Sequence, residues 1–215
     1  MTVPDKLLPE ATLGRMTLYL RALEALRTVG EPTVSSEVLA AAAGVNSAIL
    51  RKDLSLLGTF GTRGVGYRVE VLAESISATL GLERRWCVAI LGAGNLGRAL
   101  TGYAGFQEGG FRVGAVFDVA ESVVGRRLGN LTVRPVAELA AATRELGLNM
   151  AILAVPGHAA QELCDLVVAA GITNILSFAP VLLQVPEGVQ VRKVDMAREL
   201  QILAYHAAFG AGPVD

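Results

Sequence analysis

A glycine-rich turn between an apolar strand and a helix constrains the fold of this chain more than any other feature. The apolar run 86–91 predicts a buried parallel strand, and Gly92, Gly94 and Gly97 follow it with G-x-G-x-x-G spacing at the start of a helix predicted over 95–103. In dinucleotide-binding folds the first glycine permits a sharp turn, the second lets the backbone approach the pyrophosphate, and the third lets the helix pack closely on the sheet. The turn therefore predicts a nucleotide-binding α/β sheet.

An acidic residue at the end of the next strand supports this interpretation. Asp118 follows a strand predicted over 112–117 and lies about 20 residues after Gly97, the spacing at which a carboxylate binds the adenosine ribose hydroxyls. The same carboxylate would repel a 2′-phosphate. The sequence therefore favours NAD(H) over the phosphorylated dinucleotide as the cofactor.

Strands and helices alternate through the rest of the chain. Strands are predicted over 131–133, 149–155, 174–178 and 189–194, and helices over 136–146 and 158–170, which indicates a parallel sheet covered on both faces. The turns after the fourth and fifth strands either line a nicotinamide pocket or are ordinary strand-ending turns. The candidate cofactor-binding residues are Gly92, Ala93, Gly94, Asn95, Leu96, Gly97, Asp118, Val155, Pro156, Phe178, Ala179 and Pro180.

The first 82 residues have a different pattern. A helix within 7–29 is followed by a short helix over 37–43, by Gly44, and by a third helix that begins at Asn46 or Ser47 and ends at Gly58. This spacing is typical of a helix-turn-helix. The glycine-rich segment 59–69 predicts a β-hairpin, the wing of a winged helix, and a helical connector follows over 71–80. We count four basic residues and one acid, Asp53, between Asn46 and Val69, and predict a basic surface there.

The complete prediction is an α/β protein of three parts. A winged-helix (helix-turn-helix) domain over 1–82 precedes a Rossmann-type doubly wound parallel sheet over 83–190 and a C-terminal dimerisation helix within 191–215. Charged residues make up 18% of the chain, below the usual quarter, so we expect a partner chain to cover part of the surface. The start of the chain lacks the apolar core of a signal peptide, and no apolar run approaches the roughly 18 residues of a membrane span, so we expect a cytoplasmic protein with no membrane partner.

Catalytic and metal-binding patterns do not stand out. His158 lies near the predicted pocket, but a histidine at a helix start is more often a polar cap than a general base, and His206 on the terminal helix is more often a packing residue. Cys87 and Cys164 are expected to be buried thiols rather than a disulfide or zinc site. We expect no metal and no catalytic residue, because the sequence supports binding a dinucleotide better than turning one over.

Two motifs together resemble the redox-sensing transcriptional repressor Rex family over essentially the whole chain. They are R-K-D-L-S at 51–55 and G-x-R-G-x-G-Y at 61–67. The glycine turn and Phe117-Asp118 are also part of the resemblance. The resemblance implies a homodimer that binds double-stranded, inverted-repeat operator DNA. It implies further that NADH releases the protein from DNA, whereas NAD⁺ competes with NADH and permits binding. The DNA-binding candidates are Ser47, Arg51, Lys52, Ser55, Arg63, Gly64, Tyr67 and Arg68.

The resemblance also implies a switch. The terminal helix would be exchanged between subunits and inserted near the partner's nicotinamide pocket, with Arg21, Tyr103 and Asp195 changing partners between two states. Tyr103 would then also contact the cofactor. Four positions depart from the family pattern: Ala120 replaces a frequent acid, Met196 a frequent aromatic residue, and Leu56-Leu57 an aromatic pair. Two alternative functions stay open, an NAD-dependent oxidoreductase with an N-terminal regulatory domain, and a nucleotide- or CoA-binding scaffold without DNA contact.

Overall fold

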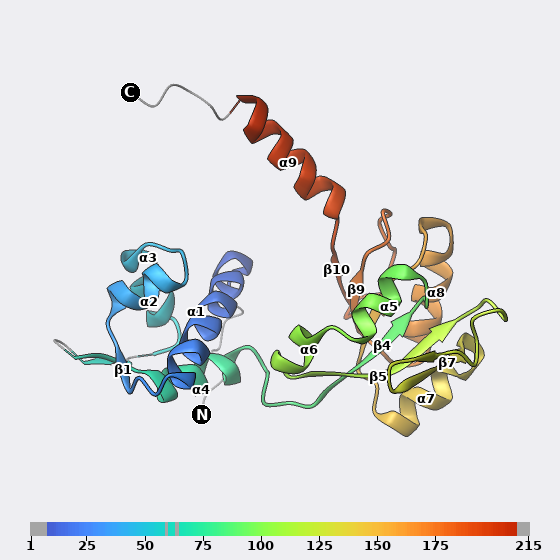
Figure 1. The fold of residues 1–215 in the computed structure, drawn as a ribbon, viewed down its shortest axis with the longest axis horizontal. Helices are drawn as coiled ribbons and strands as arrows, with labels where there is room; N and C mark the ends of the chain where they lie inside the picture. The colour runs from blue at the N-terminus through green and yellow to red at the C-terminus, as the bar shows by residue number, and fades with distance from the viewer. Residues whose placement is uncertain (1–7, 59, 63–64, 210–215) are drawn as a thin grey trace. The chain divides into compact units, whose positions relative to one another are not determined.

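The chain folds into two compact units that meet in sequence at Arg84 and Arg85 (Figure 1). We describe them from a computed structural model that covers residues 8–58, 60–62 and 65–209. The first unit is a winged helix and the second an α/β doubly wound sheet, as the sequence predicts. None of the helices within these ranges combines the length and the apolar character that a membrane crossing requires.

The described part of the winged-helix unit contains four helices and a small antiparallel sheet. Asn46 caps α3, because its side-chain oxygen accepts the Ala48 N–H at 2.7 Å, and Gly44 (φ 67°) forms the turn between α2 and α3. Sequence analysis missed strand β1, which is two residues long and exists only through its pairing with β3. The elements are α1 (Glu10–Thr28), β1 (Thr33–Val34), α2 (Ser36–Ala42), α3 (Ser47–Ser55), β2 (Gly61–Thr62), β3 (Gly66–Arg68) and α4 (Val69–Thr79), with strand order β1-β3-β2.

The second unit is a seven-stranded sheet with the first strand, β4, at its centre. The chain adds β5 and β7 on one side of β4 and then crosses back to add β8, β9 and β10 on the other, the winding of a Rossmann sheet. Among the described strands of this sheet, only β6 at one edge is antiparallel to its neighbour. The elements are β4 (Trp86–Leu91), α5 (Asn95–Thr101), α6 (Ala104–Glu108), β5 (Phe111–Asp118), β6 (Arg127–Leu128), β7 (Leu131–Pro135), η1 (Val136–Glu138), α7 (Leu139–Leu146), β8 (Met150–Leu153), α8 (Gly157–Ala169), β9 (Asn174–Ser177), β10 (Gln190–Lys193) and α9 (Met196–Phe209).

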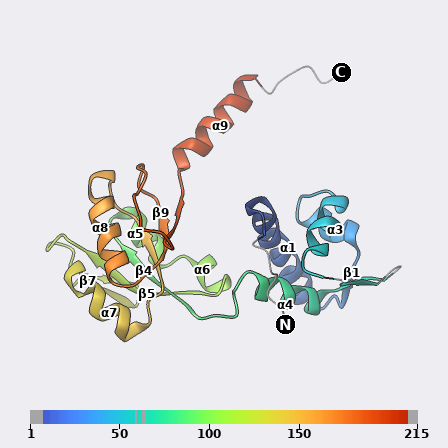
Figure 2. The same cartoon turned by 180° about the vertical axis from the view of Figure 1, so that it is seen from behind.

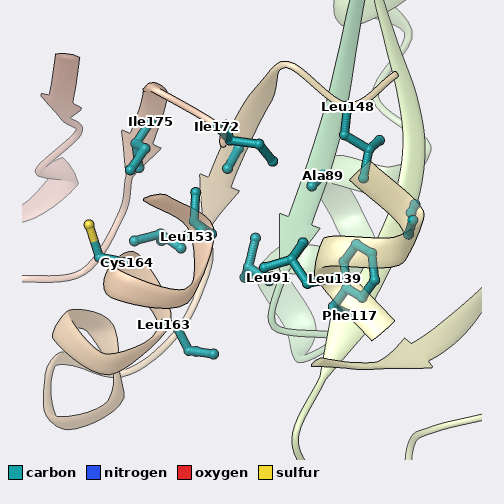
Figure 3. Packing of buried hydrophobic residues seen from close by; sticks show 14 of the residues in the cluster. Ala89, Leu91, Phe117, Leu139, Leu148, Leu153, Leu163, Cys164, Ile172 and Ile175 are labelled. Carbon is teal, nitrogen blue, oxygen red and sulfur yellow. The ribbon is translucent and has the colours of Figure 1, made fainter. Parts of the chain in front are cut away.

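Both faces of the sheet are buried. Ala89 and Leu91 of β4 pack on one face with the helices α7 and α8, whereas Val88 and Ile90 pack on the other, which explains why the strand is a continuous apolar run. Figure 3 shows the first of these cores, in which Leu91 lies between Leu153 and Phe117. The helix α5 lies in front of the sheet in Figure 1, and α8 lies in front of it in Figure 2.

Two boundaries differ from the sequence prediction in ways that bear on function. The helix after the glycine turn ends at Thr101 instead of Tyr103, because Gly102 caps it and a second short helix, α6, starts at Ala104. The fourth strand of the parallel sheet, β8, ends at Leu153, so Val155 lies in the turn after the strand. Cys87 and Cys164 are buried free thiols, as expected.

Candidate nucleotide site and nucleic-acid interface

Two of the three glycines of the turn are required by the packing of the chain itself. Gly92 has a φ of 102°, and a Cβ added there would lie 2.5 Å from the Ala154 carbonyl oxygen. A Cβ on Gly97 would overlap the carbonyl oxygen of Gly92. The sharp turn and the close approach of helix to strand are therefore both present.

Gly94 is different, because nothing in the chain requires it. Its φ of −69° and ψ of −167° suit any residue, and a Cβ added there would meet no atom within 4 Å. The backbone at Gly94 is exposed to solvent. A missing side chain at an open, unstrained surface position leaves space for a ligand to approach the backbone, and this fits a dinucleotide pyrophosphate.

Asp118 is held against the glycine turn. Its Oδ2 accepts the Ala93 N–H at 2.7 Å, and its Oδ1 accepts the Ala120 N–H at 2.9 Å. The carboxylate is half-buried at the end of β5, and each oxygen keeps a lone pair for a further donor. Ala120, one of the departures from the family pattern, thus still orients Asp118 through its backbone.

The turn lies where the winding of the sheet reverses. β4 and β8 are neighbours at the centre of the sheet, and the Ala154 N–H donates to the Leu91 carbonyl at 2.8 Å. Next to it, the Phe178 N–H donates to the Leu153 carbonyl at 2.9 Å. Open α/β sheets bind ligands outside the carboxyl ends of their strands at such a point, and the structure brings the predicted loops 155–156 and 178–180 to the same edge as the glycine turn.

Ala179 and Ser177 show what sequence reasoning could not resolve at this edge. Ala179 is fully buried, so its side chain belongs to the core and only its backbone is available to a ligand. Its N–H donates to the Ser177 hydroxyl oxygen at 3.3 Å, and Ser177 is 1% exposed. A serine within the apolar strand 174–178 was the signal that sequence analysis left unused.

The three switch candidates lie apart in sequence and on different elements. Tyr103, 56% exposed, stands between α5 and α6 with its ring edge-on to Phe106 at 5.1 Å. Asp195 accepts the Arg198 N–H at 3.1 Å at the start of α9, and this bond, followed by the Lys193 ammonium group, lowers the pKa of its carboxyl. Arg21 is exposed on α1, where it lines a groove of about 490 Å³ with Leu18, Ala22, Ala25, Leu26, Ala42 and Ala43.

Helix α3 presents a basic surface. Arg51, Lys52 and Ser55 are exposed, and Ser47 at the start of the helix is half-buried. The Arg51 Nη1 donates to the Ser36 hydroxyl at 2.9 Å and to the Glu37 carboxylate at 3.0 Å, which leaves the other guanidinium donors for a ligand.

The hairpin expected as a wing is present as β2 and β3. Arg68 is exposed, whereas the Tyr67 ring, 8% exposed, packs in the core of the winged helix, and burial raises the pKa of its hydroxyl. The structure thus gives Tyr67 a packing position rather than a surface position. Arg63 and Gly64 lie outside the described residues.

Asp53 corrects the predicted charge of this surface. Sequence analysis counted it against the basic residues around it, but its side chain is 4% exposed. It accepts hydrogen bonds from three residues of α1: Arg15 at 2.6 and 2.8 Å, Tyr19 at 2.8 Å and Thr12 at 3.3 Å. The Arg15 guanidinium, together with the Tyr19 hydroxyl, lowers the pKa of the carboxyl. The charge of Asp53 is therefore paired within the winged helix and is not part of the exposed surface of α3.

The same cluster predicts a loss of stability at alkaline pH. Burial, followed by the hydrogen bond to Asp53, raises the pKa of Tyr19 from 10.0 to about 12. Between pH 10 and pH 12 only the unfolded chain loses the Tyr19 proton. The stability that this group contributes is therefore intact below pH 10 and is lost as the pH rises through 12. We expect the free energy of unfolding to fall by about 1.4 kcal/mol per pH unit in this window.

Denaturant unfolding of the wild type and of Tyr19→Phe across this pH window measures that slope. The phenylalanine variant should show a shallower fall, with the remaining slope due to other tyrosines such as Tyr67. Equal slopes in the two proteins would contradict the assignment of the raised pKa to Tyr19.

The fold and the site define a class of protein in which a winged helix with a basic α3 is joined to a dinucleotide-type sheet. The redox-sensing transcriptional repressor Rex of Streptomyces coelicolor is 55% identical over 205 residues, which are 95% of this chain and 80% of that protein. The Rex protein of Syntrophomonas wolfei is 43% identical over 201 residues, 94% of this chain and 96% of that one. The chain belongs to the redox-sensing transcriptional repressor Rex family.

Family models and solved structures agree with this. Residues 7–55 match the model of a putative DNA-binding protein N-terminus and residues 83–181 that of a CoA binding domain. The structure of RSP in complex with β-NAD⁺ and operator DNA matches with a TM-score of 0.88 at 32% identity over 94% of each chain. RSP, a Rex-family repressor, in complex with β-NADH matches with a TM-score of 0.82 at 30% identity over 94% of this chain and 95% of that one.

Proposed function

We propose that this protein is a transcriptional repressor of the cytoplasm that binds operator DNA as a homodimer and is released from it by NADH. The observation that carries the proposal is that one chain joins an exposed basic α3 to a dinucleotide turn whose backbone at Gly94 is open to a ligand. A related protein, RSP, has been seen with operator DNA and β-NAD⁺ and, separately, with β-NADH. These complexes support the same two partners here.

The C-terminal helix supports the homodimer. Every residue of α9 is exposed within the described chain, and its apolar side chains are more than half exposed at Met196, Leu200, Leu203, Tyr205 and Phe209. A helix of 14 residues that buries nothing is marginally stable on its own in water. A second copy of the chain that covers this face, by exchange of the two helices, would supply the missing contacts.

Each module then has a separate task. A two-fold dimer presents two α3 helices to successive major grooves about one helical turn apart. There Arg51 and Lys52 reach base edges or phosphates, and Arg63 and Arg68 reach the backbone or the minor groove. The dinucleotide lies over Gly92–Gly97 with its ribose hydroxyls on Asp118. In this proposal the nicotinamide end reaches the turns at Val155-Pro156 and Phe178–Pro180.

Release requires that NADH bind one dimer geometry more tightly than another. NADH and NAD⁺ differ by one positive charge and by ring planarity, both at the nicotinamide, so discrimination belongs at that end of the site. In our proposal Tyr103, Asp195 and Arg21 exchange partners there. The Asp195 carboxylate accepts the Arg198 N–H in the first turn of α9 and forms an ion pair with Lys193. Because the carboxylate is only half-buried, both contacts can be exchanged.

The proposal is tested by titrating the protein onto the upstream region of its own gene, with NADH and NAD⁺ added separately. We expect NADH to dissociate the complex and NAD⁺ to oppose NADH. Operator affinity should fall steeply with salt, and Lys52→Ala should reduce the slope of log Kd against log salt by about one, the share of one phosphate contact. Arg144→Ala, which removes an exposed arginine of α7, is the matched control and should leave the slope unchanged.

Each failure has its own meaning. A salt-independent affinity would contradict the roles given to Arg51 and Lys52. Steady consumption of NADH with a small carbonyl compound would instead support the oxidoreductase. Nucleotide binding without any DNA binding would support the scaffold.

A further inference from the structure

One carboxylate joins α3 to α1. Asp53 follows Arg51 and Lys52 directly on α3, and all of its side-chain donors, Arg15, Tyr19 and Thr12, belong to α1. The Arg15 guanidinium meets both carboxylate oxygens, with Nε 2.6 Å from Oδ2 and Nη2 2.8 Å from Oδ1. Such a two-point contact fixes direction as well as distance.

Few other contacts constrain the orientation of α3 relative to α1. The α3 backbone packs more closely on α2 than on α1, and Leu50 and Leu54 of α3 belong to the same apolar core as Met16 and Leu23 of α1. Apolar contacts are not directional. The hydrogen bonds of Asp53 are therefore a directional link between the two helices.

Stability alone is a poor explanation for such a cluster. Removing an ionised carboxylate and a guanidinium from water is costly, and apolar residues of similar volume often stabilise a core as well or better. What an apolar pair lacks is a fixed orientation. An Arg or Lys head group lies about 6 Å from the helix axis, so a rotation of α3 by about 20° moves it by about 2 Å, more than a hydrogen bond to a base edge tolerates.

We infer that Asp53 is a positioning residue for DNA recognition: through Arg15, Tyr19 and Thr12 it sets the rotation of α3 and thereby the direction in which Arg51 and Lys52 leave the helix. This inference rests on the proposed function. It assigns Asp53 no contact with DNA, because its side chain is buried.

The test replaces the polar pair by an apolar pair. In the full-length chain, Arg15→Met combined with Asp53→Leu should fold, with a lowered Tm because the buried Tyr19 and Thr12 hydroxyls lose their acceptor. Its affinity for a scrambled duplex should stay within about twofold of the wild-type value, because phosphate contacts tolerate small displacements. Its preference for the operator over the scrambled duplex should fall about tenfold or more, the size of a lost base contact.

A matched control and a milder variant complete the experiment. Met16→Leu changes a fully buried residue of α1 at nearly constant volume and should leave the operator preference unchanged. Asp53→Asn keeps the shape of the side chain and removes its charge, and should lower the preference by a smaller factor. A folded double variant with wild-type preference overturns the inference. If the double variant does not fold, a folded Asp53→Asn with wild-type preference overturns it.

Orientation can also be measured without DNA. Residual dipolar couplings of the α3 amides should report a rotated α3 in the variants and an unrotated one in Met16→Leu. If the wild type shows no preference for the operator, the proposed function fails, while these couplings still decide whether Asp53 orients α3. Unchanged couplings in the variants would refute the inference whatever the DNA result.

Discussion

Gly97→Ala is expected to lower the free energy of unfolding of the nucleotide-binding unit by about 3 kcal/mol, the upper range for overpacking a core. The added methyl group would overlap the Gly92 carbonyl oxygen, which is backbone and cannot turn aside as the end of a flexible side chain can. Helix α5 would have to move away from β4, and the turn would open. Urea unfolding of the variant and the wild type measures the difference.

Gly102→Ala is the matched control. Gly102 lies at the other end of α5, has a φ of −103° that alanine adopts, and has open space around its missing Cβ. We expect a change of no more than about 0.5 kcal/mol, as for ordinary surface substitutions. If Gly97→Ala were as stable as this control, the close packing of α5 on β4 would not be a requirement of the fold.

Gly94→Ala is expected to leave the fold intact and to weaken the binding of NADH and NAD⁺ alike by about 30-fold or more, the cost of a lost charge-assisted hydrogen bond. The methyl group meets nothing in the chain, but it occupies the space through which a pyrophosphate reaches the backbone. Isothermal titration calorimetry with each cofactor, beside urea unfolding, measures both effects.

Two outcomes would oppose this prediction. Unchanged affinities would place the dinucleotide away from the turn. A change in the ratio of the two affinities would mean that the pyrophosphate end of the site distinguishes the redox states, because Gly94 lies at that end.

Local patterns were sufficient for most of the fold. The continuous apolar run of β4 followed by glycines predicted the strand, the turn and the helix together, because burial on both faces and a strained backbone each have a direct signature in sequence. The predicted end of α5 was wrong by two residues, because Gly102 is one of several glycines in that region. The Tyr103 ring packs over Gly105, and a Cβ added to Gly105 would lie 2.7 Å from that ring. That contact depends on tertiary structure.

Asp53 and Tyr67 show the limit of reading charge and aromatic content along the chain. Asp53 lies three positions after Leu50 and next to Leu54, so the helical period alone placed it on the buried face. We counted the charge of Asp53 and did not use its position in the helical repeat. Tyr67 could not be placed in this way, since the two faces of a hairpin become distinct only when β3 pairs with β1 and packs on the helices.

The hydrogen bonds of Asp118 have a consequence for what the proposed sensor measures. Because the Asp118 carboxylate already accepts the Ala93 N–H, the turn loses little conformational freedom when a dinucleotide binds. The resulting gain in binding free energy is equal for NADH and NAD⁺. A strong common affinity keeps the site filled by one form or the other. Occupancy by NADH then follows the proportion of the two cofactors, and the total size of the cofactor pool has little effect.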